Sequence, residues 1–191
     1  MLADFITSKS RIKLLHVFLS SPYEMCHVRE LVRRTGDEIN AVRRELLFLE
    51  SRGVLKKEKR ANRVYYFLSK DYPYYFDLLR LAAKMTGIGA EIIKNRAKLG
   101  KIKYAMLSGK FVRRLEKAPE EVDLLIVGTI VLPEIAVLVR NEEARLNTEI
   151  NYTVMTDEEF DFRKSRHDPF ILAVLAQSRI MLLGDEENML A

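Results

Sequence analysis

The sequence predicts an α/β protein, α+β overall, in which two differently built parts follow one another. Residues 1–70 show apolar positions at helical spacing, followed by two short strand patterns around a basic turn. Residues 101–191 alternate instead between strand and helix patterns, which indicates a sheet, expected to be mixed, with helices packed against it. We therefore expect an N-terminal domain over 1–70, a helical connector over 71–100 and a C-terminal α/β domain over 101–191.

The composition is that of an ordinary globular protein. Of the 191 residues, 48% are apolar and 31% are charged, which excludes the disordered class. The longest apolar region, residues 122–139, is interrupted by Asp123, Gly128, Pro133 and Glu134, so no membrane span is predicted. The opening residues MLADFITSKS lack the pattern of a signal peptide. We expect a cytoplasmic protein with no membrane partner.

Charge is distributed unevenly along the chain. Residues 1–70 hold 15 Lys or Arg and 8 Asp or Glu, a net charge of +7, whereas residues 71–191 hold 17 against 19, a net charge of −2. A basic first third followed by a nearly neutral remainder indicates two modules with different partners. The first module is expected to bind a polyanion.

The thiol and imidazole groups predict neither a disulfide nor a metal cluster. Cys26 is the only cysteine, and His16, His27 and His167 are scattered along the chain. A catalytic pair of Cys26 and His27 is disfavoured, because adjacent residues of a strand point to opposite sides. We expect Cys26 to be a buried packing residue.

Three short helices are predicted before the hairpin. The first is capped by Ser8 or Ser10. Its apolar positions recur at helical spacing at Ile12, Leu15, Phe18 and Leu19. The second, HVRELVRRTG, ends at Gly36, and the third, INAVRRELLFLESRG, is capped by Asp37 and ends at Gly53. A tight turn between the last two is typical of a helix-turn-helix.

Two strands with a basic turn follow the third helix. Val54 and Leu55 open the first strand, Val64–Leu68 form the second, and Arg60–Arg63 form the turn. This order of three helices and a hairpin, over roughly residues 2–69, resembles the winged helix-turn-helix of ArsR-type transcriptional regulators. The resemblance implies double-stranded DNA as a partner.

The DNA-contacting residues are predicted from the helix and hairpin geometry. At about 100° per residue, one face of the third helix is the core face, with Ile39, Val42, Leu46 and Leu49. Asn40, Arg43 and Arg44 then face outward and are the major-groove candidates, because Arg pairs with guanine and Asn with adenine. The cations suited to phosphates are Arg29, Arg33, Lys56, Lys57, Lys59, Arg60 and Arg63. The alternative interpretation is a solvated charged face.

Leu47 and Phe48 do not fit a lone DNA-binding module. Both fall toward the outer half of the third helix, where apolar side chains are costly to leave in water. They are expected to pack against the following helix or against a second protomer. The second arrangement would give a homodimer that reads two half-sites.

The connector, Tyr72–Leu99, is predicted as one or two helices interrupted near Gly87 and Gly89. It opens with an aromatic group, Tyr72, Tyr74, Tyr75 and Phe76. This group is interpreted as a seam between domains in preference to a platform for stacking nucleic-acid bases.

The C-terminal domain is predicted as strands and helices in alternation. The strands cover residues 102–109, 122–128, 148–155 and 179–185. The helices cover residues 110–116, 132–147 and 157–178. Pro133 suits a helix start, and Thr156 with Glu159 forms a capping box.

Residues 107–128, LSGKFVRRLEKAPEEVDLLIVG, contain the candidate metal- and phosphate-binding residues of this domain. Residues two apart in a strand point the same way, so Glu121 and Asp123 would project together and hold Mg²⁺. Glu149, on the strand predicted next, is the candidate third carboxylate. The turn before the helix, Ser108–Lys110, would receive phosphates through its backbone N–H groups.

This stretch resembles the signature of minimal nucleotidyltransferases, in which Gly-Ser precedes Asp-x-Asp by about ten residues. Gly109 matches the glycine, Lys110 stands where the serine belongs, Glu121 replaces the first aspartate and Asp123 matches the second. The resemblance implies Mg²⁺ and a nucleotide as ligands. Lys110 is expected to block turnover, because a long cation occupies the electrostatic place of the metal.

Three classes of function follow. The first is a DNA-binding transcriptional regulator, needing no cofactor, whose second domain is inactive and serves sensing, dimerisation or partner binding. The second is an active Mg²⁺-dependent nucleotidyltransferase with an autoregulatory winged helix. The third is a protein-interaction module whose winged helix has lost DNA. The first class is preferred.

Overall fold

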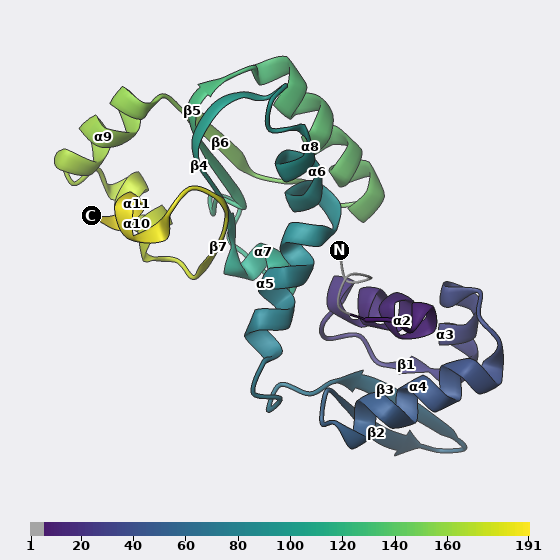
Figure 1. Cartoon of the computed structure of the whole chain (residues 1–191). Coiled ribbons are helices and arrows are strands. Elements are labelled where there is room, and N and C mark those ends of the chain that lie inside the picture. Colours follow the sequence, from purple (N-terminus) through teal and green to yellow (C-terminus); the bar gives the residue numbers. More distant parts are fainter. Residues whose placement is uncertain (1–5) are drawn as a thin grey trace. The chain divides into compact units, whose positions relative to one another are not determined.

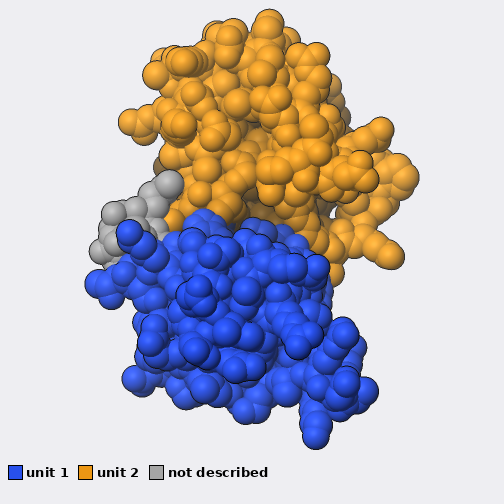
Figure 2. Space-filling model, turned by 90° about the vertical axis from the view of Figure 1, so that its right-hand side faces the viewer, with its two compact units in different colours: residues 1–82 blue, residues 83–191 orange. Residues whose placement is uncertain are grey.

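The protein is described by a computed structural model that covers residues 6–191. The chain divides into two compact units, residues 1–82 (unit 1) and 83–191 (unit 2), which Figure 2 shows in different colours. Residues 1–5, part of the predicted N-terminal domain and of the opening stretch without a signal-peptide pattern, lie outside the described residues. No described helix is both long and apolar enough to cross a membrane.

Unit 1 places short helices against a small sheet (Figure 1). Its described elements before residue 70 are α2 (Lys9–Ser20), β1 (Cys26–His27), α3 (Val28–Thr35), α4 (Ile39–Ser51), β2 (Leu55–Arg60) and β3 (Arg63–Leu68). The strand order is β1-β3-β2, and all pairs are antiparallel. The predicted order of three helices and a hairpin is confirmed. Cys26 and His27, treated as strand residues in the sequence analysis, form β1, in which Cys26 pairs with Tyr66.

The helices of unit 1 begin and end largely where the sequence places them. The Ser8 hydroxyl accepts a hydrogen bond from the Arg11 amide and caps α2. Gly36 ends α3 in the left-handed conformation, at φ 67°. The apolar faces meet in one core whose fully buried side chains include Leu14, Phe18, Leu31, Val42 and Leu46. Cys26 is also buried, as predicted.

Asp37 does not cap α4. That helix begins after Glu38, whose side chain makes no capping hydrogen bond. Asp37 instead pairs with Lys13 of α2 at 2.5 Å, and the hydrogen bond from this lysine lowers the pKa of the Asp37 carboxyl. The carboxylate therefore ties the helix-turn-helix turn to α2.

The segment 71–100, predicted as a connector, forms two helices. These are α5 (Tyr75–Met85), most of which belongs to unit 1, and α6 (Gly87–Asn95), which belongs to unit 2. Of the aromatic group, Tyr75 is buried, whereas Tyr74 and Phe76 are exposed.

Unit 2 is a four-stranded mixed sheet with helices on both faces (Figure 1). Its further elements are β4 (Gly100–Ser108), α7 (Gly109–Arg113), β5 (Leu124–Ile130), α8 (Leu132–Leu146), β6 (Tyr152–Met155), α9 (Asp157–Ser165), α10 (Pro169–Ala176), β7 (Arg179–Leu183) and α11 (Glu186–Leu190). The strand order is β6-β5-β4-β7, with β5 and β6 parallel and the other pairs antiparallel. The predicted α/β class with a mixed sheet is confirmed.

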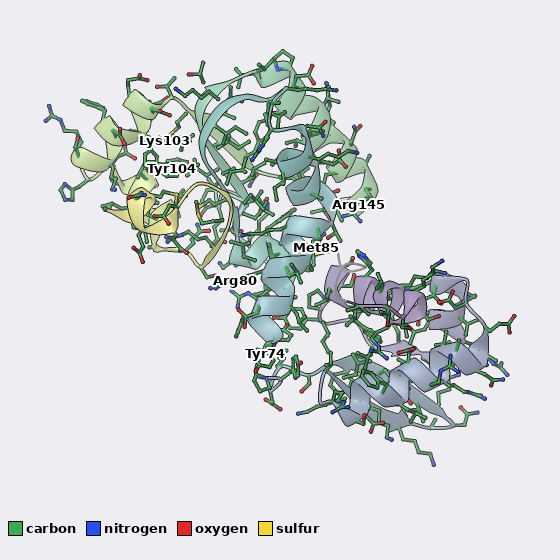
Figure 3. The ribbon with its side chains drawn as sticks, viewed as in Figure 1. Tyr74, Arg80, Met85, Lys103, Tyr104 and Arg145 are labelled. Carbon is green, nitrogen blue, oxygen red and sulfur yellow. The ribbon has the colours of Figure 1, made fainter. Side chains whose placement is uncertain are left out.

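Alternate residues of β5 supply the two cores of unit 2. Leu124 and Ile126 pack with buried residues of α6 and α8 on one face. Leu125 and Val127 pack on the other face with buried residues of α9, α10 and α11. Figure 3 shows Tyr104 of β4 on this second side, where its ring lies 5.9 Å from that of Phe160.

Two predicted helices of unit 2 have different bounds. The helix expected over 110–116 is α7, which ends at Arg114 in the left-handed conformation, at φ 55°. The single helix expected over 157–178 is two, because His167 is left-handed and Asp168 caps a new helix that begins with Pro169.

Candidate functional site

The outer face of α4 presents three polar side chains. Val42, Leu46 and Leu49 are buried, which leaves Asn40, Arg43 and Arg44 exposed on the opposite side. Ile39, predicted as a core residue, is only half-buried at the helix start. The burial of one face by apolar residues therefore orients the predicted base-reading residues toward solvent.

An open groove of about 560 Å³ lies between α3, α4 and the hairpin. Three of the predicted cations line it, each from a different element: Arg29 of α3, Arg43 of α4 and Arg63 of β3. Within residues 6–191 none of the three forms an ion pair with an acidic side chain. The groove thus gathers positive charge that the described part of the protein does not neutralise.

His27 positions the start of α3 beside this groove. Its Nδ1 accepts a hydrogen bond from the Glu30 amide at 3.1 Å and caps the helix. The sequence analysis missed this role, although a polar residue directly before VRELVRR was the available signal. Leu47, 54% exposed, also lines the groove and supplies an apolar surface between the cations.

Phe48 differs from Leu47, with which the sequence analysis grouped it. Its ring is half-buried and lies under the Arg11 guanidinium, 3.7 Å from the ring centroid. The contact is a cation–π interaction within unit 1. Phe48 therefore packs on its own chain and gives no support for a second protomer.

The wing cations divide into paired and unpaired groups. Three predicted phosphate contacts are already paired with carboxylates: Lys56 with Asp71, Lys57 with Glu50 and Arg60 with Glu58. Within residues 6–191 Lys59 has no acidic partner, and neither does Arg33 on α3. Among the predicted DNA-contacting cations, those without an acidic partner in the described part of the chain are therefore Arg29, Arg33, Arg43, Arg44, Lys59 and Arg63.

The turn after β4 in unit 2 is held by its own side chains. The Ser108 hydroxyl accepts a hydrogen bond from the Phe111 amide and caps α7. The Gly109 amide, which a phosphate would need, donates to the Ser178 carbonyl at 2.6 Å. This donor of the predicted phosphate turn is therefore already satisfied.

The structure brings the motif acids together with lysines. The Lys110 ammonium donates to both carboxylate oxygens of Glu121, at 2.6 and 2.8 Å. Asp123 is 1% exposed and pairs through Oδ2 with Lys117, and the same oxygen accepts from the Asn151 amide at 2.9 Å. Lys117 was missed by the sequence analysis, since its approach depends on the path of the loop after α7.

Glu149 lies outside the strand that was predicted to carry it. The strand predicted over 148–155 begins only at Tyr152, and Glu149 lies exposed ahead of it. Parallel pairing of Leu124 with Tyr152 brings Asn151, a neutral amide, beside Asp123. Within residues 6–191 no hydrogen bond or ion pair links Glu149 to Glu121 or Asp123, so its role as a third carboxylate stays a prediction.

Comparison with known proteins gives little further information. No family model matches this sequence, and no curated protein matches it. A solved structure, reduced HlyU from Vibrio cholerae N16961, is similar at 23% identity, covers 44% of this chain and 83% of that chain, and has a TM-score of 0.36. A similarity of this size does not assign the chain to a family.

Proposed function

We propose that the protein is a DNA-binding transcriptional regulator that reads double-stranded DNA with unit 1. The observation that carries the proposal is the groove in which Arg29, Arg43 and Arg63 meet from three different elements without acidic partners in residues 6–191. DNA phosphates attract such a cluster, and the exposed polar face of α4 lies beside it. Arg29 and Arg63 bind phosphates, and Asn40, Arg43 and Arg44 contact base edges.

Unit 2 serves sensing, dimerisation or partner binding in this proposal. A homodimer would place two copies of α4 on two half-sites of a duplex. The function requires no cofactor, and a DNA partner accords with a cytoplasmic protein. Nucleotidyl transfer is disfavoured because both acids of the motif already have lysine partners.

The test is DNA binding by the full chain, measured by fluorescence anisotropy at fixed salt on duplexes recovered from genomic DNA by the protein. Arg44→Ala should weaken binding to the recovered sites by about 1–3 kcal/mol, the usual scale for a base-reading arginine. Arg140→Ala removes the same charge from an exposed position on α8 of unit 2 and should leave binding unchanged. Equal dissociation constants for the wild type, Arg43→Ala and Arg44→Ala would rule out α4 as the reading helix.

A further inference from the structure

The carboxylates of Glu121 and Asp123 are placed where a divalent cation would be expected. Asp123 directly precedes β5, Glu121 lies two residues before Asp123, and the Asp123 side chain is almost fully buried. A buried carboxylate is costly unless a cation or hydrogen-bond donors compensate it. Carboxylate oxygens in such a position are the ligands that Mg²⁺ prefers.

Two lysines already fill most of this requirement, and among the oxygens of these two carboxylates only Asp123 Oδ1 has no hydrogen-bond partner within residues 6–191. Lys110 lies directly after the turn glycine, and its ammonium spans both oxygens of Glu121. Lys117 reaches Asp123 from the loop after α7, with only 21% of its side chain exposed. Two ammonium groups balance two carboxylates, so the net charge of these four groups is zero.

The remaining donors do not complete a metal site. The Asn151 side-chain nitrogen donates to the backbone carbonyls of Pro119 and Glu121, the latter at 3.2 Å. The Ser108 hydroxyl is engaged as the α7 cap, and Glu149 is exposed and makes no hydrogen bond or ion pair with Glu121 or Asp123 within residues 6–191. A divalent cation would have to displace two ammonium groups and would find no third carboxylate, so these residues do not fit Mg²⁺.

We propose that Lys110 and Lys117 replace a divalent cation at Glu121 and Asp123, which makes this site of unit 2 a metal-independent ion-pair centre. The ion pairs connect α7 and the loop after it to the residues just before β5. A bound cation would otherwise hold these segments together. This inference concerns unit 2 and is independent of DNA binding by unit 1.

The test is direct Mn²⁺ binding by the full chain, followed by electron paramagnetic resonance of the free ion, with Mn²⁺ as the probe for Mg²⁺. The wild type should leave Mn²⁺ free. The Lys110→Ala/Lys117→Ala variant leaves both carboxylates without a cationic partner. It should bind Mn²⁺ at least about tenfold more tightly than the wild type, a difference of about 1.4 kcal/mol. Adding Asp123→Asn to that variant should abolish the gain.

Thermal unfolding supplies a second readout. The melting temperature of the wild type should be the same in EDTA and in excess Mn²⁺, whereas that of the double variant should fall in EDTA and recover with Mn²⁺. Should the double variant not fold, Lys110→Ala alone serves, because the Lys110 side chain is 41% exposed. Wild-type Mn²⁺ binding that Asp123→Asn removes would overturn the proposal, as would a double variant indifferent to Mn²⁺.

Discussion

Glu45 is a buried acidic residue of α4 in unit 1. It accepts hydrogen bonds from the Ser8 hydroxyl at 2.7 Å and from Arg11 Nε at 2.8 Å, which joins α4 to the start of α2. Burial by itself would raise its pKa, but the hydrogen bonds from Ser8 and Arg11 outweigh burial and hold the pKa of Glu45 below the usual glutamate range. The charged form is therefore the stabilising one.

Glu45→Gln should lower the free energy of unfolding at neutral pH by about 1–3 kcal/mol, because a buried charge-assisted acceptor is lost. Since the folded pKa is depressed, this contribution is present above the unfolded pKa of about 4.3 and disappears as the pH falls through the lower folded value. Urea unfolding followed by circular dichroism should show the gap between wild type and variant closing in acid. The exposed pair of Glu58 provides the control, and Glu58→Gln should not change stability measurably.

The surroundings of Cys26 disfavour its charged form, whereas those of Glu45 favour the charged carboxylate. Burial, followed by the nearby carboxylates of Glu24 and Glu30, raises the pKa of the Cys26 thiol to about 11. Only the thiolate reacts, so iodoacetamide at pH 8 should modify the folded protein about a hundredfold more slowly than an ordinary cysteine. Mass spectrometry with and without urea measures this difference. Equal rates in the two conditions would show that the thiol is open to solvent and ionised.

At the scale of elements, α7 packs so closely against the segment before β7 that position 109 has no room for a side chain. A Cβ at this position would lie 2.2 Å from the Ser178 hydroxyl and 3.0 Å from the Ser178 Cβ. Gly109→Ala should therefore destabilise unit 2 by about 1–3 kcal/mol through overpacking. Adding Ser178→Gly removes the two closest atoms and should restore part of the loss in thermal unfolding. If the second change restores nothing, the glycine serves some other purpose.

Element boundaries also show how far the sequence predicts this fold. Local signals sufficed for the caps at Ser8 and Thr156 and for the capping glycine at Gly36. Asp168 followed by Pro169 was an equally local signal for the break between α9 and α10, and the sequence analysis passed over it. Bounds are therefore predictable where one or two adjacent residues decide them.

The candidate acidic site was less predictable because it depends on register and loop path. Glu149 seemed suitable from its strand pattern, yet the pairing of β5 with β6 brings Asn151 next to Asp123. Lys117 lies six positions from Asp123 along the chain, and only the course of the loop brings the two together. Neither relation is encoded in periodicity, whereas the contact between Lys110 and Glu121 follows from the motif itself.

At the scale of the whole molecule, the positive charge of residues 1–70 is only partly available to a polyanion. Lys57 and Lys59 are two residues apart on β2, so they share one face of the hairpin. Lys57 is paired with Glu50 at 2.9 Å, whereas Lys59 has no acidic partner within residues 6–191. Comparing substitutions of these two lysines therefore distinguishes the effect of an unpaired charge from that of a charge already neutralised by an ion pair.

Binding of the full chain to duplex DNA should weaken steeply with salt, because each neutralised phosphate contributes about −0.9 to the slope of log K against log salt concentration. Lys59→Ala should make that slope less steep by about 0.9, for one lost phosphate contact, and leave the preference among duplexes intact. Lys57→Ala should change the slope less, since its charge is already shared with Glu50. Anisotropy titrations over a salt series measure both variants, and equal slope changes would show that internal ion pairs do not withhold wing cations from DNA.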